Sequence, residues 1–274
     1  IEKFSEYVAD GLVDTELIRV ESEHSALSAC VGASAAGART MTASSSAGLA
    51  LMFEILGVTS GLRLPIVMNI ANRALSSPIN IHCDHSDSMN CRDAGWIQIY
   101  SENCQEVYDF NLIAIKLAEI INLPVMVMQD GFIVSHGVEN LCILEDKKAK
   151  TFIGKYKPKF SLLDFKKPKT FGALQLTDYN FETKIQISKA METAKLKYLE
   201  IAKEYSKVSG RNYNYYEYYG NKNAQEIIVV LSSTAGTVKS IIDENQSFGL
   251  IKINLFRPFP HEEIKNILKD KKRI

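Results

Sequence analysis

Two kinds of apolar pattern alternate along the first half of the chain. Short apolar runs rich in β-branched residues predict strands over residues 15–20, 40–43, 65–70 and 124–128. Stretches with small or apolar residues at helical spacing predict helices over residues 25–36, 47–60 and 106–121. Continuous apolar strands are typical of a parallel sheet that is covered on both faces. The order of strands and helices therefore predicts a doubly wound α/β domain.

The second half of the chain follows a different pattern. Residues 151–178 predict a loop with two prolines, and residues 181–209 predict one long polar helix that acts as a connector. The remaining segments predict a second, smaller α/β unit, with strands over residues 226–231 and 249–255, a helix over residues 237–244 and a final helix after Pro260. The predicted parts are a first domain, a linker with the connecting helix, and a second, partial domain, over residues 1–165, 166–219 and 220–274.

Composition places the chain among ordinary globular proteins. Its 274 residues are 46% hydrophobic and 23% charged, which is enough apolar material for a substantial core. The 32 Lys and Arg residues balance the 32 Asp and Glu residues, so no basic field exists to attract nucleic acid. The apolar runs are short and interrupted, so we expect neither a signal peptide nor a membrane span. Nucleic acid and membrane are therefore not expected partners.

The five cysteines are odd in number and widely spaced. This distribution argues against a disulfide framework and for a reducing compartment, so we expect a cytoplasmic protein. The sequence contains no Cys-x-x-Cys. Because an iron–sulfur cluster usually needs four closely organised thiolates, we expect any electron-carrying cluster to lie on another subunit.

Acidic residues stand directly before a long run of small residues, 26–48. A carboxylate that opens such a segment is costly to bury without a partner, so Glu23 is a candidate for catalysis. The alternative is that Glu23 caps the following helix, where a carboxylate is favourable near the N-terminal dipole. The residues alone favour the cap. Glu21 is the weaker candidate, and we expect it to be exposed or paired with Arg19.

Five separated segments carry a resemblance to a known family. In chain order they read ESEHSALSACVGASAAGARTMTASSSAG, NRALSSPINIHCDHSDS, MQDGFIVSHGVEN, LSSTAGTVKS and KINLFRPFPHEE. Together they closely resemble the alpha subunit of the pyruvate:ferredoxin oxidoreductase family over nearly the whole chain. The resemblance implies a doubly wound parallel-sheet domain of the pyrimidine-binding type found in thiamine diphosphate enzymes. A smaller α/β domain like the C-terminal domain of transketolase would follow, and we expect both domains to be incomplete here.

The start of the chain supports that expectation. Apolar residues at helical spacing begin at Ile1, so a helix begins at once and we expect residues to be missing upstream. In the family this helix follows a strand and a Tyr-Pro-Ile-Thr-Pro turn, whose threonine helps to hold the substrate. That turn is absent from this sequence.

The resemblance implies an enzyme that is active only with partner subunits. Its reaction would be the reversible oxidative decarboxylation of pyruvate to acetyl-coenzyme A and CO₂ with reduction of ferredoxin, in anaerobic metabolism. The implied partners are beta, gamma and delta type subunits of one hetero-oligomeric complex, together with ferredoxin, pyruvate and coenzyme A. The alternatives are a branched-chain 2-oxoacid or 2-oxoglutarate as substrate, and a non-catalytic assembly subunit.

Thiamine diphosphate chemistry needs a carboxyl group bonded to N1′ of the cofactor's aminopyrimidine. The resemblance gives this role to Glu23, which occupies the family's Ser-Glu-x-x-Ala position. Ser45 and Ser46 lie in the turn that borders the pyrimidine in the family, and we expect them to contact the cofactor. The Gly-Asp-Gly and asparagine-pair signature of a diphosphate site is missing around Asp130. We therefore expect a beta subunit to share the cofactor and to hold the diphosphate and Mg²⁺, with 4Fe-4S clusters on partner subunits.

Arg73 directly follows a predicted strand, near the edge of a parallel sheet where ligands usually bind. A guanidinium group matches a carboxylate with two parallel hydrogen bonds. The resemblance implies that Arg73 binds the carboxylate of the 2-oxoacid substrate. The alternative is a structural arginine paired with Asp84 or Asp87.

Residues 82–87 read His-Cys-Asp-His-Ser-Asp, a combination that would suit zinc or iron. No third, distant ligand has an obvious spacing, and the family has a similar Asp-His-Ser-Asp loop without a protein-bound metal. We therefore expect no metal ligands in this chain, and metal-dependent hydrolysis is only a minor alternative. The favoured interpretation is a hydrogen-bonded loop near the cofactor or a partner subunit, with Arg92 as its charge partner.

Overall fold

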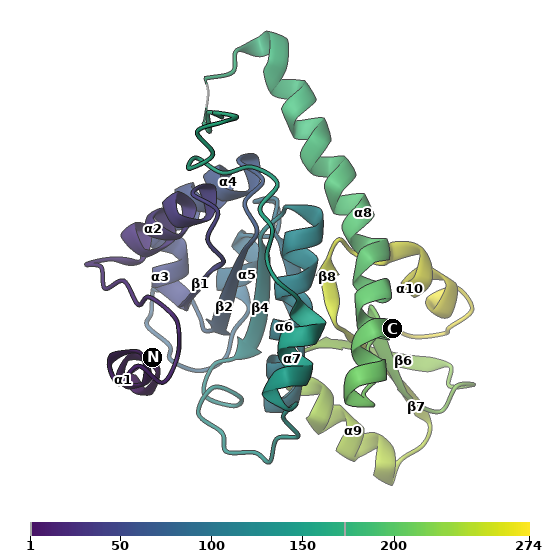
Figure 1. Cartoon of the computed structure of the whole chain (residues 1–274). Coiled ribbons are helices and arrows are strands. Elements are labelled where there is room, and N and C mark those ends of the chain that lie inside the picture. The colour runs from purple at the N-terminus through teal and green to yellow at the C-terminus, as the bar shows by residue number, and fades with distance from the viewer. Residues whose placement is uncertain (1, 173) are drawn as a thin grey trace.

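The computed structural model describes residues 2–172 and 174–274, and its largest element is a five-stranded sheet (Figure 1). The strands lie in the order β1 (Thr40–Ser44), β2 (Ile66–Asn72), β4 (Val125–Asp130), β3 (Ile97–Tyr100) and β8 (Leu255–Arg257). The first four are parallel, and β8 is antiparallel to β3. The carboxyl ends of the parallel strands therefore share one edge, where ligands usually bind in such sheets.

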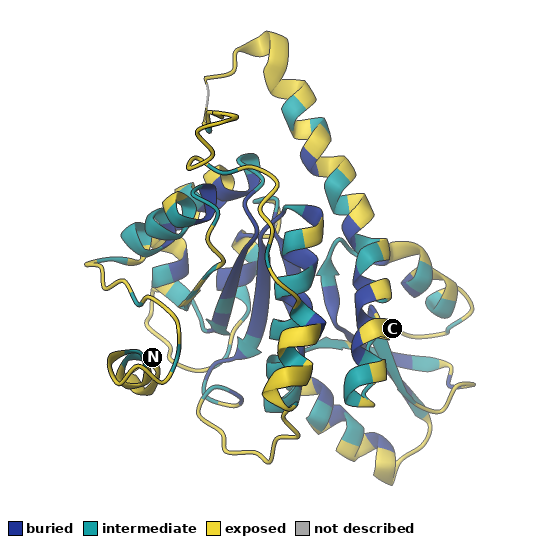
Figure 2. Ribbon diagram, in the orientation of Figure 1, coloured by how far each residue is buried: buried dark blue, intermediate teal, exposed yellow. Residues whose placement is uncertain are grey.

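Helices cover both faces of this sheet, as the side chains of β4 demonstrate. Successive side chains of a strand point to opposite faces. Val125 and Val127 belong to an apolar cluster with helix α6, whereas Met126 and Met128 belong to a cluster with α2, α3 and α4. The helices are α2 (Glu23–Ala35), α3 (Ser46–Leu51), α4 (Phe53–Gly61) and α6 (Cys104–Ile121). Figure 2 shows β2 and β4, which lie between them, as largely buried. The predicted doubly wound arrangement is confirmed.

Helix α6 illustrates how local sequence and core contacts agree. The side chain of Asn103 caps the helix by accepting a hydrogen bond from the Glu106 N–H at 3.0 Å. The helix ends at Asn122, which has a left-handed conformation with φ of 53°, a common way to end a helix. Phe110, Ile113 and Leu117 lie one turn apart and are buried, so one stripe of the helix faces the sheet.

A second, three-stranded sheet follows the long connecting helix. That helix, α8 (Thr177–Ser209), packs against α6 through its C-terminal half, and its first turns stand away from the rest of the molecule (Figures 1 and 2). The strand order is β5 (Tyr216–Gly220), β7 (Phe248–Ile253), β6 (Glu226–Leu231). β6 is parallel and β5 antiparallel to β7. The flanking helices are α9 (Thr234–Glu244) and α10 (His261–Leu268).

Two features join the second sheet to the first. β8, which follows β7 in the chain, leaves the second sheet and pairs with β3 of the first. Lys252 on β7 is 1% exposed and forms ion pairs with Glu102, Glu106 and Glu217. Glu102 and Glu106 precede and begin α6, so the ammonium group connects the two parts of the chain. The predicted division at residues 165 and 219 stays a prediction.

Several element predictions need correction. Residues 15–20 form no strand, because no neighbouring strand pairs with them, and the side chain of Ile18 is 65% exposed. The single helix predicted over residues 47–60 is interrupted at Met52. The strand predicted over residues 249–255 ends at Ile253, after which the chain turns into β8. Elements that the pattern did not predict are β3, β5 and β8, and helices α5 (Ser86–Asn90) and α7 (Asp146–Ile153). The first helix, α1 (Glu2–Ala9), agrees with the predicted start, although Ile1 lies outside the described residues.

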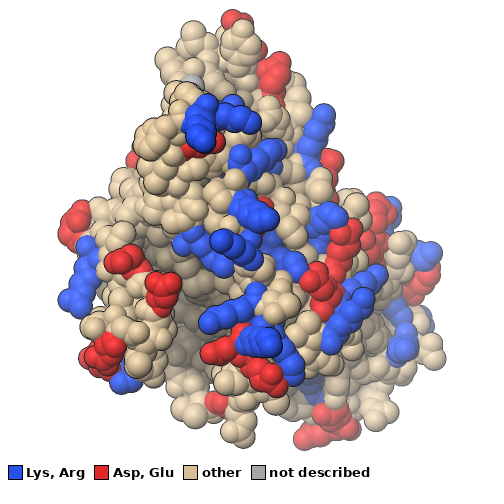
Figure 3. Space-filling view, in the orientation of Figure 1, with Lys and Arg blue, Asp and Glu red and all other residues tan. Residues whose placement is uncertain are grey.

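The surface carries both signs of charge. Figure 3 shows acidic side chains interspersed among lysines and arginines on the face in view, in keeping with the net charge of zero. Within the described residues, no helix combines the length and the apolarity that crossing a bilayer requires.

Candidate functional site

The predicted site residues lie at the carboxyl edge of the first sheet, around the turn between β1 and α3. Strand-to-helix turns at this edge present backbone N–H groups and side chains to a ligand. Ser45 and Ser46 form the turn, Arg73 follows β2, and Glu23 reaches it from the start of α2. The fold thus brings together all four residues that the sequence singled out.

Glu23 is the first residue of α2, and its neighbour caps that helix. The Ser22 side chain accepts a hydrogen bond from the Ser25 N–H at 3.3 Å, so Ser22 rather than Glu23 supplies the side-chain cap. Glu23 lies in the first turn, where the helix dipole favours a carboxylate. The Glu23 carboxylate instead lies over Gly48, where a Cβ atom would be 2.7 Å from Glu23 Oε1. Since Cβ atoms in proteins do not approach another atom so closely, glycine at position 48 leaves the space that the carboxylate uses.

Ser44 borders the same space. Its Oγ is buried without a hydrogen-bond partner among the described residues, and a Cβ at position 48 would lie 2.7 Å from this oxygen. A buried hydroxyl group without a partner costs about 1–3 kcal/mol, so such a group calls for an explanation. A carboxylate and an unsatisfied hydroxyl group side by side suit a ligand with several polar ring atoms.

Glu21 lies outside this group. It is exposed, as predicted, and it accepts a hydrogen bond from the Ser25 hydroxyl. Arg19 donates to Ser5 Oγ at 3.2 Å rather than to Glu21.

Arg73 and Ser45 are held together by a hydrogen bond. Arg73 Nε donates to Ser45 Oγ at 2.6 Å, and the Ser45 hydroxyl in turn donates to the Ala71 carbonyl at 2.6 Å. Gly131, just after β4, makes room for this arrangement, because a Cβ there would lie 2.6 Å from Arg73 Cγ and from the Asn72 carbonyl oxygen. The half-buried guanidinium therefore has a fixed base and remaining N–H donors.

The alternative role for Arg73, an ion pair with Asp84 or Asp87, does not match the geometry. Only the backbone N–H of Arg73 contacts an aspartate, donating to Asp87 Oδ2 at 3.1 Å. Within the described residues, the guanidinium has no carboxylate at ion-pair distance. The charge of Arg73 thus lacks an internal partner, which suits a residue that binds an anionic ligand.

Asp87 shapes the site through contacts that the sequence interpretation did not foresee, since it considered Asp87 only as part of a hydrogen-bonded loop and as an ion-pair partner of Arg73. It is 2% exposed and accepts hydrogen bonds from the Ser46 N–H at 2.9 Å, the Arg73 N–H at 3.1 Å and Asn72 Nδ2 at 2.8 Å. These bonds fix the segments after β1 and β2 relative to each other. No short-range pattern reveals this role, because its partners lie up to 41 positions away in the sequence.

Ser46 uses its own polar groups within the protein. Its backbone is in the left-handed region, with φ of 47°, and its hydroxyl donates to the Ala74 carbonyl at 2.5 Å. Ser45 is likewise engaged with Arg73. Both serines shape the turn, and their predicted contact with a cofactor stays a proposal.

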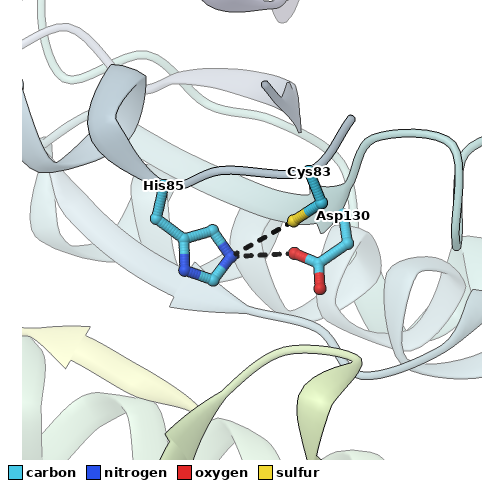
Figure 4. Close-up of side chains that lie close together, drawn as sticks. All are labelled: Cys83, His85 and Asp130. Carbon is cyan, nitrogen blue, oxygen red and sulfur yellow. Dashed lines mark hydrogen bonds and ion pairs between the residues drawn. The ribbon is translucent and has the colours of Figure 1, made fainter. Parts of the chain in front are cut away.

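The loop at residues 82–87 meets the end of β4 (Figure 4). His85 Nε2 donates to Asp130 Oδ1 at 2.8 Å, and Cys83 Sγ lies 3.9 Å from the same nitrogen. Asp130 Oδ2 accepts from the N–H of Ser233 at 3.0 Å and from its hydroxyl at 2.5 Å. Burial and the Asp130 carboxylate raise the pKa of the Cys83 thiol. Burial also favours a raised pKa for Asp130, but the bonds from His85 and Ser233 outweigh it and hold that pKa below its usual value.

The predicted charge partner of this loop is wrong. Arg92 is exposed and pairs with its neighbour Asp93 at 3.3 Å. The loop is instead held by Asp130 and by Asp87, both of which are buried.

Two family profiles match the chain. The profile of pyruvate flavodoxin/ferredoxin oxidoreductases, described as thiamine diphosphate-binding, matches residues 1–203. The profile of core domain II of pyruvate:ferredoxin oxidoreductase matches residues 224–274. The chain therefore belongs to the pyruvate:ferredoxin oxidoreductase family of thiamine diphosphate-binding oxidoreductases, and the family predicted from the motifs is confirmed.

Individual proteins indicate which members of the family the chain resembles. The chain is 51% identical to pyruvate synthase subunit PorA of Thermotoga maritima, covering 100% of this chain and 71% of the relative. It is 42% identical to ketoisovalerate oxidoreductase subunit VorA of Pyrococcus horikoshii, covering 100% of this chain and 71% of that relative. Among solved structures, 2-oxoglutarate:ferredoxin oxidoreductase from Magnetococcus marinus superposes with a TM-score of 0.71 at 19% identity. That match covers 99% of this chain and 51% of the solved chain, about half its length, and it supports the fold alone.

Proposed function

We propose that the chain is the alpha subunit of a pyruvate synthase. The complex would oxidatively decarboxylate pyruvate to acetyl-coenzyme A and CO₂ with reduction of ferredoxin, in a reversible reaction. The observation that carries the proposal is the meeting of the Glu23 carboxylate and the Arg73 guanidinium around one strand-to-helix turn. Relatives named pyruvate synthase subunit support it with identities of 42–51%.

Glu23 would bind the pyrimidine end of thiamine diphosphate. Its carboxyl group would hold a proton at the N1′ atom, while the unsatisfied Ser44 hydroxyl offers a further hydrogen bond beside it. The chemistry that thiamine diphosphate supplies is addition to the 2-oxoacid carbonyl and acceptance of the electrons released with CO₂. Ser45 and Ser46 would support the turn that borders the ring.

Arg73 would bind the carboxylate of the 2-oxoacid. Its guanidinium keeps free N–H donors beyond the bond to Ser45, and its charge has no internal carboxylate partner. Two parallel hydrogen bonds to a carboxylate would orient the substrate as well as hold it. Since all 2-oxoacids share this carboxylate, Arg73 contributes to binding rather than to the choice among them.

Partner subunits are part of the proposal. Asp130, the residue nearest to a diphosphate signature, lacks the preceding glycine and the asparagine pair of that signature, which supports a diphosphate and Mg²⁺ site on a beta subunit. The clusters of 4Fe-4S type, and the contacts with ferredoxin and coenzyme A, would lie on the beta, gamma or delta subunits. All five cysteines are free thiols, which suits the reducing environment of the cytoplasm, where we place the complex.

The substrate is tested by assaying the assembled complex. Reduction of ferredoxin is measured with pyruvate, 2-oxoisovalerate and 2-oxoglutarate, each with coenzyme A. We expect kcat/KM for pyruvate to exceed that for either larger 2-oxoacid by at least about 10- to 200-fold, the discrimination that one methylene group gives in a fitted pocket. A preference for 2-oxoisovalerate would favour the branched-chain alternative, and no turnover with any 2-oxoacid would favour an assembly subunit.

A further inference from the structure

We propose that Cys83, His85 and Asp130 form a binding site for one divalent cation of the zinc class. The three side chains come from two places in the chain, the loop before α5 and the carboxyl end of β4 (Figure 4). Their ligand atoms all lie within 4.8 Å of one another. Asp130 is the distant third ligand that the sequence spacing did not reveal, so this proposal departs from the expectation of no metal ligands. The site contains neither Glu23 nor Arg73.

The distances fit a tetrahedral ion after small movements. Zinc bonds to sulfur at about 2.3 Å and to nitrogen or oxygen at about 2.0–2.2 Å, which places neighbouring ligand atoms roughly 3.3–3.5 Å apart. In the structure, His85 Nε2 is 3.9 Å from Cys83 Sγ and 2.8 Å from Asp130 Oδ1, and all three ligand atoms lie within 4.8 Å of one another. The first separation is longer and the second shorter than the ion needs. Shifts of about 1 Å in the loop would admit the ion.

The charges of these side chains balance a dication. Cys83 would bind as a thiolate, releasing its proton to the buffer as the metal–sulfur bond forms, and Asp130 would bind as a carboxylate. His85 would bind through Nε2 as the neutral tautomer, with its proton on Nδ1 instead of on Nε2. Two negative ligands and one doubly charged cation then leave no net charge in a largely buried place. Sulfur and imidazole nitrogen favour zinc-like ions over Mg²⁺ or Ca²⁺, which prefer oxygen ligands.

Neighbouring groups orient the ligands and leave one side open. Ser233 holds Asp130 Oδ2 through its N–H at 3.0 Å and its hydroxyl at 2.5 Å, so Oδ1 faces His85. Such outer hydrogen bonds are typical of metal sites. The His85 side chain is 22% exposed whereas that of Asp130 is 2% exposed. A cation can therefore approach past His85, and water can supply the fourth ligand.

A second group of potential metal ligands differs from this one because the protein already places a cation among them. Glu102, Glu106 and Glu217 also bring their oxygens within 4.8 Å of one another. The Lys252 ammonium group already lies among them, at 2.9, 2.5 and 2.8 Å respectively. Lys239 adds a second ammonium group beside Glu102 and Glu217, so the protein itself supplies the cations for these carboxylates. In the cluster of Cys83, His85 and Asp130 no lysine or arginine forms an ion pair within the described part of the chain.

The test measures zinc bound by the purified complex at buffered concentrations of free Zn²⁺, using equilibrium dialysis and elemental analysis. We expect Cys83→Ser to bind one zinc fewer per chain than the wild type. Loss of an outer partner weakens zinc affinity by about 10- to 100-fold, and loss of the Cys83 ligand should weaken it more. Ser233→Ala should weaken it by about tenfold. Serine at position 83 keeps the size of the side chain, and circular dichroism checks the fold. We avoid changing Asp130, because it also anchors Ser233.

Matched controls separate this site from thiols in general. Cys142→Ser removes an exposed cysteine and Cys30→Ser a half-buried one, and neither should change zinc binding. Equal zinc binding by wild type and Cys83→Ser would overturn the proposal. So would an equal loss in Cys83→Ser and Cys142→Ser, because it would indicate scattered surface binding.

Discussion

At the scale of single residues, substitution of Glu23 should have the largest effect on activity. Its carboxylate lies free of the helix cap and beside the unsatisfied Ser44 hydroxyl. Glu23→Gln keeps the shape but loses the exchangeable proton, so turnover of the assembled complex should fall on the order of a hundredfold or more. Steady-state kinetics with pyruvate measure this. Glu21→Gln, at an exposed position, is the matched control and should keep its activity. Near-normal turnover of Glu23→Gln would contradict the assignment of Glu23 as the residue that binds N1′.

A substitution at Gly48 tests the role of the Glu23 carboxylate without changing Glu23 itself. A Cβ at this position would lie 2.7 Å from both Glu23 Oε1 and Ser44 Oγ, so Gly48→Ala displaces the carboxylate by steric contact. We expect turnover to fall on the order of a hundredfold, the cost of a misplacement of about 1 Å. Gly57→Ala is the control, since within the described residues nothing lies within 4 Å of a Cβ there. An equal loss of activity in both variants would show that the loss does not come from displacement of the Glu23 carboxylate at Gly48.

Arg73 should affect substrate binding more than cofactor binding. Arg73→Lys keeps the charge but loses the paired donors, so the 2-oxoacid should bind more weakly by about 1.5–3 kcal/mol, the range for hydrogen bonds to charged groups. The loss should be similar for pyruvate and 2-oxoisovalerate, because both present the same carboxylate. Arg92→Lys, at an exposed pair with Asp93, is the control. A loss confined to one substrate would place Arg73 near the variable side chain instead.

The candidate site was predictable from the sequence where a motif carries the information locally. Glu23 and Arg73 stand inside segments that resemble the family, and the fold places them together. The structural roles of Asp87 and Asp130 were not recognised, because they depend on hydrogen-bond partners as far as 41 and 103 positions away. Such partnerships depend on which strands become neighbours, and a single sequence does not fix that order.

At the scale of elements, the cap of α6 is a sensitive point. Asn103 satisfies the Glu106 N–H at 3.0 Å, and α6 supplies much of the buried cluster on one face of the first sheet. Asn103→Ala should lower the free energy of unfolding by about 0.5–2 kcal/mol. Urea denaturation measures this, with Asn180→Ala on the exposed start of α8 as the control. Equal stability of the two variants would show that the cap contributes little.

Strand predictions succeeded or failed according to what lies beside each strand. Residues 124–128 are apolar throughout and lie in the middle of the sheet, so composition and burial agree. Residues 15–20 include the polar residues Thr15, Glu16 and Arg19 and lie where no strand pairs with them. Strand β3 was missed because it has four residues and includes Gln98, which is fully buried and bonded to the Ser88 carbonyl. A buried polar residue of this kind is recognised only when its partner is known.

At the scale of the whole molecule, Lys252 holds two sheets together. Burial opposes its charge, but Glu106 and Glu102 outweigh burial and raise its pKa. Lys239 also pairs with Glu102 and Glu217, so Lys252→Met leaves the buried Glu106 without its cation. This should lower the free energy of unfolding by about 3–5 kcal/mol. Exposed Lys203→Met is the control in urea denaturation. A loss no larger than that of the control would contradict this role.

The pH dependence of that variant has a definite sign. In the wild type, burial favours a raised pKa for Glu217, but the bonds from Lys252 hold it below its usual value. The stability that this carboxylate contributes is therefore present above its unfolded pKa and is lost as the pH falls through the folded value. The difference between wild type and Lys252→Met should shrink as the solution is acidified, because protonated carboxyl groups no longer repel one another.

Strand β8 limits where this chain can be divided into fragments that fold separately. A fragment that stopped after α8 would follow the division that the sequence suggests, yet it would remove the strand that covers β3. The uncovered backbone of β3 could then pair with the same edge of another copy. Such a fragment would also carry Glu102 and Glu106 with no ammonium group between them. Expression of the first sheet alone should thus yield self-associating material, and a soluble fragment would need to keep residues up to Arg257.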